Sequence, residues 1–288
     1  MTRGKAGDPD HGIELLWRPR EPEPRPGLSL DRIVRTAIDL ADAEGLASLS
    51  MRKIANRLGF TTMSLYRHVP GRDQLVDLMV DEVLGAPSDG DTDETTPRGW
   101  RDRLERHARQ GWATRRRHPW LAEVRGTRHL PGPNAVAQYD LMLGALTGTA
   151  LTPAEVIAVV DLVGRFIDAE ALHLLETRRE EQRSGVTENE WWGARHTLYD
   201  RLDRYPAISH LWSAGGWDSP EDSFEFGLRR LLDGIEVLIN RRDETRYEMR
   251  AETRACEECG RPLAPSPSGR PRVYCSPACR QRAYRKRA

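Results

Sequence analysis

One stretch, residues 50 to 72 with the sequence SMRKIANRLGFTTMSLYRHVPGR, constrains the fold of this chain more than any other. It predicts two short helices that are joined by a tight turn. Ser50 is a good N-cap for the first helix, apolar residues then recur at a spacing of three and four, and Gly59 ends the helix. Thr61 or Thr62 can cap the second helix, and a proline after it disfavours its continuation. The pattern is typical of a helix-turn-helix.

The second helix of this stretch carries side chains that fit a DNA groove. The stretch contains five basic residues and no acidic residue, so its rim attracts phosphate. Arg67 can bond guanine bidentately, which is worth about 1 to 3 kcal/mol of discrimination, whereas Tyr66 and Arg72 suit phosphates. The methyl groups of Thr62 and Met63 can touch thymine. The alternative is that the two helices form a packing corner with an ordinary surface histidine.

Charge is distributed unevenly along the chain, although the net charge is zero. Residues 250 to 288 contain ten Lys or Arg against three Glu, a charge of +7, which leaves −7 on residues 1 to 249. Such an asymmetry can serve a partner, or it can merely keep the tail solvated. The sequence has no run of about 18 apolar residues and no apolar signal segment at its start, so we expect a cytoplasmic protein without membrane contact.

Composition divides the chain into four parts. The expected parts are a disordered N-terminal arm at 1–27, a helix-turn-helix DNA-binding domain at 28–85, an α-helical effector-binding and dimerisation domain at 98–245, and a basic tail with four cysteines at 250–288. The arm is rich in Pro, Gly and charge, which disfavours order. Its few apolar residues offer a docking contact: Ile13, Leu15, Leu16 and Trp17.

The sequence after the helix-turn-helix region predicts long helices and no strand, so the expected fold class is all-α. Helical periodicity covers about 100–118, 135–146, 152–176 and 222–240. The helix that follows Thr152 is apolar over much of its circumference, which predicts burial from two sides. Residues 178–221 predict a polar, irregular segment with four tryptophans as anchors: Trp191, Trp192, Trp212 and Trp217.

Residues 28–85 resemble the DNA-binding domain of the tetracycline repressor (TetR) family, most specifically at LYRHV and the following GRDQL. More weakly, DLVGRFIDAEALHLLE and FEFGLRRLLDGIEVLI are similar to the two helices that form the dimer interface in that family. The resemblance implies a homodimer, which two-sided burial also favours. Two copies of the recognition helix then meet successive major grooves about 34 Å apart, so the operator is expected to be a palindrome on double-stranded DNA.

The resemblance also implies roles for individual residues. It places Arg52 at the start of the supporting helix, within reach of phosphate or guanine, and Arg72 at the start of the next helix, against the DNA backbone. With the residues of the second helix and its cap, the candidate DNA-contacting set is Arg52, Thr61, Thr62, Met63, Ser64, Tyr66, Arg67, His68 and Arg72.

Members of the family bind a small-molecule effector in the helical body, and the resemblance suggests His107, Arg125, Thr127, Gln138 and His173 as its contacts here. The helical pattern places Trp112 and Phe166 near the same interior. Arg125 and His173 fall where the tetracycline repressor uses a histidine and a glutamate around a metal-drug complex. An anionic or aromatic effector therefore fits at least as well as tetracycline with magnesium.

The tail contains all four cysteines of the chain, as Cys256-x2-Cys259 and Cys275-x3-Cys279 separated by fifteen residues. Four thiolates at this spacing suit one tetrahedral zinc ion, and the wider second pair is typical of a treble-clef knuckle. Free thiols or a disulfide switch are the alternatives. The basic residues after the last cysteine can grip phosphate, form a solvated helix or dock a protein.

Two functions follow from these features. The first is a transcriptional repressor that leaves its operator when an effector binds the body. The second is a redox- or zinc-responsive regulator whose sensor is the cysteine tail. An enzyme is not expected, because the sequence has no Gly-rich phosphate loop, no G-x-S-x-G elbow and no H-E-x-x-H motif.

Overall fold

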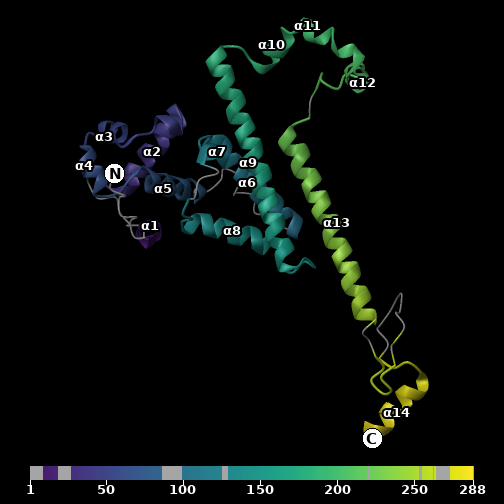
Figure 1. Ribbon diagram of the computed structural model, residues 1–288. Coiled ribbons are helices and arrows are strands. Elements are labelled where there is room, and N and C mark those ends of the chain that lie inside the picture. The colour runs from purple at the N-terminus through teal and green to yellow at the C-terminus, as the bar shows by residue number, and fades with distance from the viewer. Residues whose placement is uncertain are drawn as a thin grey trace, which may run out of the picture.

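The computed structural model describes residues 9–18, 27–85, 99–124, 129–219, 221–252, 255–261, 263 and 273–287. Helices dominate, and none of these residues lies in a β-strand, so the all-α prediction is confirmed. Figure 1 shows a cluster of short helices at the N-terminal side, a body of longer helices, and a small C-terminal unit beyond the end of α13. We call α2 to α5, residues 30–84, the head domain and α6 to α13, residues 100–252, the body.

The head domain forms because caps start and stop its helices where the sequence predicts. The hydroxyls of Ser29 and Ser50 accept hydrogen bonds from the first turns of α2 and α3, and Gly59 ends α3 with a left-handed φ of +76°. Ile33, Leu65 and many other apolar side chains form one buried core. The elements are α2 (Leu30–Glu44), the 3-10 turn η1 (Leu46–Ser48), α3 (Met51–Leu58), α4 (Thr62–Tyr66) and α5 (Arg72–Leu84).

The N-terminal arm contains a helix where the sequence predicts disorder. Helix α1 (Pro9–Leu16) packs against α5, with Leu16 buried and Leu15 half-buried against the head-domain core. Burial of these two leucines supplies the apolar contact that an isolated arm of this composition lacks. The predicted docking contact is therefore formed by part of the apolar cluster, while Ile13 remains exposed.

The body has its own core, in which side chains such as Leu104, Leu146 and Leu228 are fully buried. Its main helices are α6 (Trp100–Arg117), α7 (Leu121–Val124), α8 (Pro133–Leu146), α9 (Pro153–Ser184) and α13 (Ser223–Glu252). The last two extend well beyond their predicted ends at 176 and 240. No Gly or Pro interrupts either extension, and good helix formers with local ion pairs such as Glu180–Arg183 continue α9.

Between α9 and α13 the chain forms short helices that bridge the ends of the two long ones (Figure 1). They are α10 (Glu188–Gly193), α11 (His196–Tyr199), the 3-10 turn η2 (Leu202–Arg204) and α12 (Pro206–Ser213). The four tryptophans that the sequence predicts as anchors of this segment do not belong to the body core. Each is 43–53% exposed and they contact one another in pairs, because the segment packs on itself and not on the body core: Trp191, Trp192, Trp212 and Trp217.

The helices in the described ranges are too short or too polar to cross a membrane.

Candidate nucleic-acid interface and associated sites

Helix α4 is a short helix whose inner side is fixed and whose outer side is free. Leu65 and Val69 are fully buried and hold α4 against α3. The hydroxyl of Thr61 caps the helix by accepting from the backbone N–H of Ser64 at 3.3 Å. On the outer side Met63 is 71% exposed and Tyr66 is 45% exposed, which is unusual for large apolar or aromatic side chains. A rigid helix with an exposed aromatic and methyl surface results.

Most of the predicted DNA-contacting residues lie in α4 or directly beside it in the sequence. Arg52 and Arg67 are exposed, whereas Thr62, Ser64 and His68 are half-buried. The hydroxyls of Thr61 and Ser64 lie 2.9 Å apart, so each has a structural partner already.

Arg72 is held more tightly than the sequence predicts. Its Nη2 donates to the carbonyl oxygen of Leu46 at 2.8 Å, and its Nε donates to that of Leu49 at 3.3 Å. The guanidinium therefore fastens η1 to the start of α5. Contact of Arg72 with the DNA backbone remains a prediction.

Three carboxylates make contacts across the joint between head domain and body that sequence analysis missed. Asp42 lies 2.9 Å from Nδ1 of His118 and accepts from the indole N–H of Trp120 at 2.7 Å. Asp77 lies 2.5 Å from Nδ1 of His129. No periodic signal reveals them, because an acidic residue on an amphipathic helix normally faces solvent.

Asp81 makes the most extensive of these contacts. Its carboxylate accepts from the backbone N–H of Ala135 at 3.0 Å and from the side-chain amide of Asn134 at 3.1 Å. It thereby caps α8 from another helix, where the N-cap Gly132 has no side chain; a Cβ there would lie 2.3 Å from Cγ of Asp81. Gln138 donates to the carbonyl oxygen of Leu84 at 3.4 Å, so this predicted effector contact also lies at the joint.

The body interior contains an aromatic stack. The rings of Trp112 and Phe224 are stacked with their centroids 4.7 Å apart. Phe166 also stacks on Phe224, with the ring centroids 5.7 Å apart. His107 is half-buried on the same helix as Trp112. His173 is exposed, because it falls outside the buried stripe of α9, and its role as an effector contact remains a prediction. The predicted contacts Arg125 and Thr127 lie outside the described residues.

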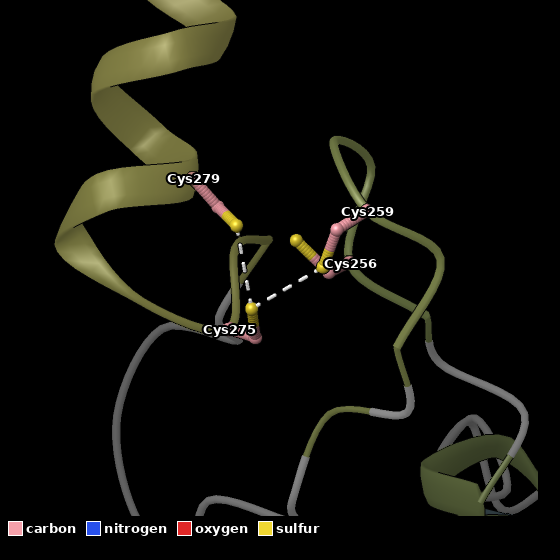
Figure 2. Close-up of side chains that lie close together, drawn as sticks. All are labelled: Cys256, Cys259, Cys275 and Cys279. Carbon is pink, nitrogen blue, oxygen red and sulfur yellow. Dashed lines mark hydrogen bonds between the residues drawn. The ribbon is translucent and has the colours of Figure 1, made fainter.

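The four cysteines of the tail converge, with all sulfur atoms within 4.8 Å of one another (Figure 2). Sγ of Cys275 lies 3.5 Å from Sγ of Cys259 and 3.5 Å from Sγ of Cys279. Tetrahedral zinc with Zn–S bonds of about 2.3 Å requires sulfur atoms about 3.8 Å apart, so the spacing and the soft donor set fit this ion. Gly260 gives the first pair its tight turn with a φ of +70°.

Helix α14 (Pro277–Arg287) supplies the last cysteine, Cys279, and its supporting charge. The hydroxyl of Ser276 accepts from the backbone N–H of Cys279, which lies in the first turn. Nη2 of Arg282 donates to Sγ of Cys279 at 3.0 Å. Burial opposes ionisation of Cys256, but hydrogen bonds from backbone N–H groups outweigh it and lower the pKa of this thiol to about 6. The cluster therefore favours thiolate at two of its cysteines, Cys256 and Cys279.

Comparison with known proteins places the chain in one family. The bacterial tetR-family regulatory protein model matches residues 33–79, and the tetracyclin repressor-like C-terminal domain model matches residues 94–239. The HTH-type transcriptional repressor DrrR1 of Streptomyces coeruleorubidus is 40% identical over 243 residues, which are 82% of this chain and 89% of DrrR1. An HTH-type transcriptional regulator of Saccharopolyspora erythraea is 30% identical over 242 residues, covering 81% of this chain and 96% of that protein.

A solved structure agrees with this placement. ActR of Streptomyces coelicolor in complex with actinorhodin is 29% identical, with 75% of this chain and 98% of ActR covered and a TM-score of 0.59. The first of these family models covers most of the head domain, with its exposed α4. The chain belongs to the tetracycline repressor (TetR) family and is a DNA-binding transcriptional regulator, not an enzyme.

Proposed function

We propose that this regulator is a cytoplasmic repressor that binds a palindromic operator as a homodimer and leaves it when a small molecule binds the body. The exposed surface of α4, with Tyr66 and Arg67 on a helix fixed by Leu65, is the observation that carries the proposal. The relative DrrR1 is described as a transcriptional repressor, which supports repression as the direction of control.

On the operator, α4 lies in the major groove. Arg67 reads guanine, the methyl groups of Thr62 and Met63 contact thymine, and Tyr66 and Arg52 position the helix on phosphates. Ser64 and His68 are half-buried and contact the groove at its edge, while Thr61 and Arg72 act mainly by holding α4 and η1 in place.

The dimer forms through α9 and α13. Both helices carry large apolar side chains that stay exposed in the single chain, although the opposite sides of the same helices are buried in the body core. Large apolar side chains that stay exposed on neighbouring helices are typical of a protein interface. The exposed side chains are Ile157, Leu162 and Leu172 of α9, and Phe226 and Val237 of α13.

The effector binds beside the aromatic stack of the body and is an aromatic or anionic small molecule. Trp112 and Phe166 offer stacking surfaces, and His107 offers a polar contact on the same helix as Trp112. The ActR structure contains actinorhodin, which supports a small-molecule site in a body of this kind. Gln138 links α8 to the end of α5, so a movement of the body on effector binding is transmitted through this residue to the head domain.

Selection of bound fragments from random double-stranded DNA tests the proposal. We expect a two-fold symmetric consensus whose half-sites are about one helical turn apart, because a dimer presents two copies of α4. A consensus without symmetry, or no enrichment above non-specific binding, would contradict the operator model.

We further propose that the cysteine tail binds one zinc ion through Cys256, Cys259, Cys275 and Cys279. Zinc would hold two chain segments together that have few apolar residues of their own, so the tail folds when the ion binds. Elemental analysis of protein purified without added metal is expected to find one zinc per chain, and replacement of Cys256 by serine should remove it. Protein that retains no zinc at any step would refute this site.

A second candidate function makes the tail the sensor. Cys259 is exposed and its sulfur lies 3.5 Å from that of Cys275, so an oxidant can reach a thiol pair that is close enough to join. Loss of zinc or formation of a disulfide would then change operator affinity. Under this alternative, a chain without residues 250–288 binds the operator but no longer responds to oxidation, whereas the effector response persists under the first function.

A further inference from the structure

Helix α1 contacts both sides of the joint between the head domain and the body. On the head side, Leu16 is only 7% exposed, and Arg18 forms an ion pair at 3.6 Å with Asp31 of α2. On the body side, the indole N–H of Trp17 donates to the carbonyl oxygen of Pro131 at 3.2 Å. Gly12 lies so close to Leu130 that a Cβ would come within 2.7 Å of it. The helix therefore touches two units at once.

These contacts surround the place where the head domain is oriented. Figure 1 shows α1 beside α5, the helix that leads from the head domain to the body, with α8 close to the end of α5. Residues of α1, α2, α5 and the start of α8 together line a cavity of about 420 Å³. Asp81 of α5, which caps α8, is one of them. Any rotation of α5 against α8 therefore changes the surface on which α1 packs.

We propose that α1 is a strap that holds α5 and the start of α8 in one relative position. Docking of Leu16 and Trp17 stabilises this position because both sides of the seat must be in place at the same time. A chain with an undocked arm then samples more orientations of the head domain. The operator binds only one of these orientations. The free energy needed to restrict the head domain to that orientation therefore weakens DNA binding.

Hydrogen exchange of the full-length protein without DNA tests the strap. Replacement of Leu16 by glutamate places a charge in the buried seat and should undock α1. We expect faster exchange in residues 78–84 of α5 and 129–136 at the start of α8, with unchanged exchange in α3 and in α9. Ile13 provides a matched control, because it lies on the same helix but is 42% exposed; I13E should leave all four regions unchanged.

A milder variant separates the strap from a folding defect. W17F keeps an aromatic ring but removes the N–H that donates to Pro131, so it should increase exchange at 129–136 by several-fold without lowering the melting temperature. Operator affinity of L16E should fall about 3- to 10-fold relative to I13E, in line with a lost preorganisation. Unchanged exchange at both ends of the joint in L16E would overturn the proposal, whatever the operator affinity.

Discussion

Asp81 shows how one side chain can join two domains. It is 7% exposed, it belongs to the head domain, and it supplies the cap that α8 of the body lacks. Replacement of Asp81 by alanine leaves the N–H of Ala135 and the amide of Asn134 without this acceptor. We expect the free energy of unfolding to fall by about 1 to 3 kcal/mol, measured by urea denaturation.

The matched control for Asp81 is Asp140, an exposed carboxylate in the middle of α8. D140A should change the free energy of unfolding by no more than about 0.5 kcal/mol. Equal destabilisation by both substitutions would show that the cap contributes nothing specific.

Arg282 is the corresponding residue in the tail, because its guanidinium donates to a sulfur of the proposed zinc site. Four thiolates and one Zn²⁺ carry a net charge of −2, which a nearby cation stabilises. Substitution R282A should weaken zinc affinity by about 10- to 100-fold, measured by competition with a colorimetric chelator. Arg280 stacks near Tyr284 on the same helix without contacting a sulfur, so R280A should bind zinc as the wild type does.

At the residue scale, the sequence predicted local contacts but not contacts between residues that are distant in the chain. The caps at Ser29, Ser50 and Thr61 were predictable because a cap acts on its own helix, and the four cysteines because their spacing is local. The partners of Asp81 lie 53 and 54 positions away, so only the folded arrangement reveals them. For the same reason the hydrogen bonds from Arg72 to the carbonyl oxygens of Leu46 and Leu49, which lie 26 and 23 positions away, were not predicted.

At the scale of elements, one carboxylate joins the start of α9 to the C-terminal half of α13. Glu155 forms a capping box with Thr152 at the start of α9 and also accepts from the guanidinium of Arg242 in α13. The hydrogen bond from Arg242, followed by those from Thr152, lowers the pKa of Glu155 from 4.5 to about 2. Its stabilising contribution is therefore complete above pH 4.5 and is lost as the pH falls towards 2.

The substitution E155Q tests this link. We expect a lower melting temperature than that of the wild type at pH 7, and a difference that shrinks as the pH is lowered from 4.5 to 3. In this range the unfolded chain, in which the pKa of Glu155 is near 4.5, takes up a proton that the folded protein, with a pKa of about 2, does not. Glu176 is exposed on the same helix, and E176Q should show no such pH-dependent difference. A difference for E155Q that is constant with pH would argue against the ion pair.

Elements were more predictable at their starts than at their ends. Thr152 with Pro153 fixed the start of α9, but its end at Ser184 lies beyond the last apolar position, where helix propensity and local ion pairs such as Glu180–Arg183 continue the helix. The packing of the segment from α10 to α12 was not predictable for another reason. Its tryptophans are typical core residues, and whether they contact the body or one another depends on the packing of distant elements.

At the scale of the whole molecule, the proposed dimer accounts for the apolar side chains that α9 and α13 leave exposed. Leu162 lies on this surface and is 43% exposed in the single chain. The substitution L162E should raise the dimer dissociation constant at least about 100-fold, since an unpaired carboxylate would be buried at the interface. Sedimentation velocity across a dilution series measures the change.

The matched control places the same charge on a different exposed apolar residue. M63E on α4 should remain a dimer and lose operator affinity, whereas L162E should lose both dimer and operator affinity. An L162E protein that sediments as a dimer would remove α9 from the interface.

The central claim is that α4 reads DNA, and the most direct measurement is the operator affinity of a chain in which Tyr66 and Arg67 are both alanine. Both side chains are exposed, so the melting temperature and the helix content should match those of the wild type. The account predicts at least a 100-fold loss of affinity for the selected operator, about 2.7 kcal/mol, because one contact to guanine and one to phosphate disappear. An affinity equal to that of the wild type, in a protein with native helix content, would contradict it.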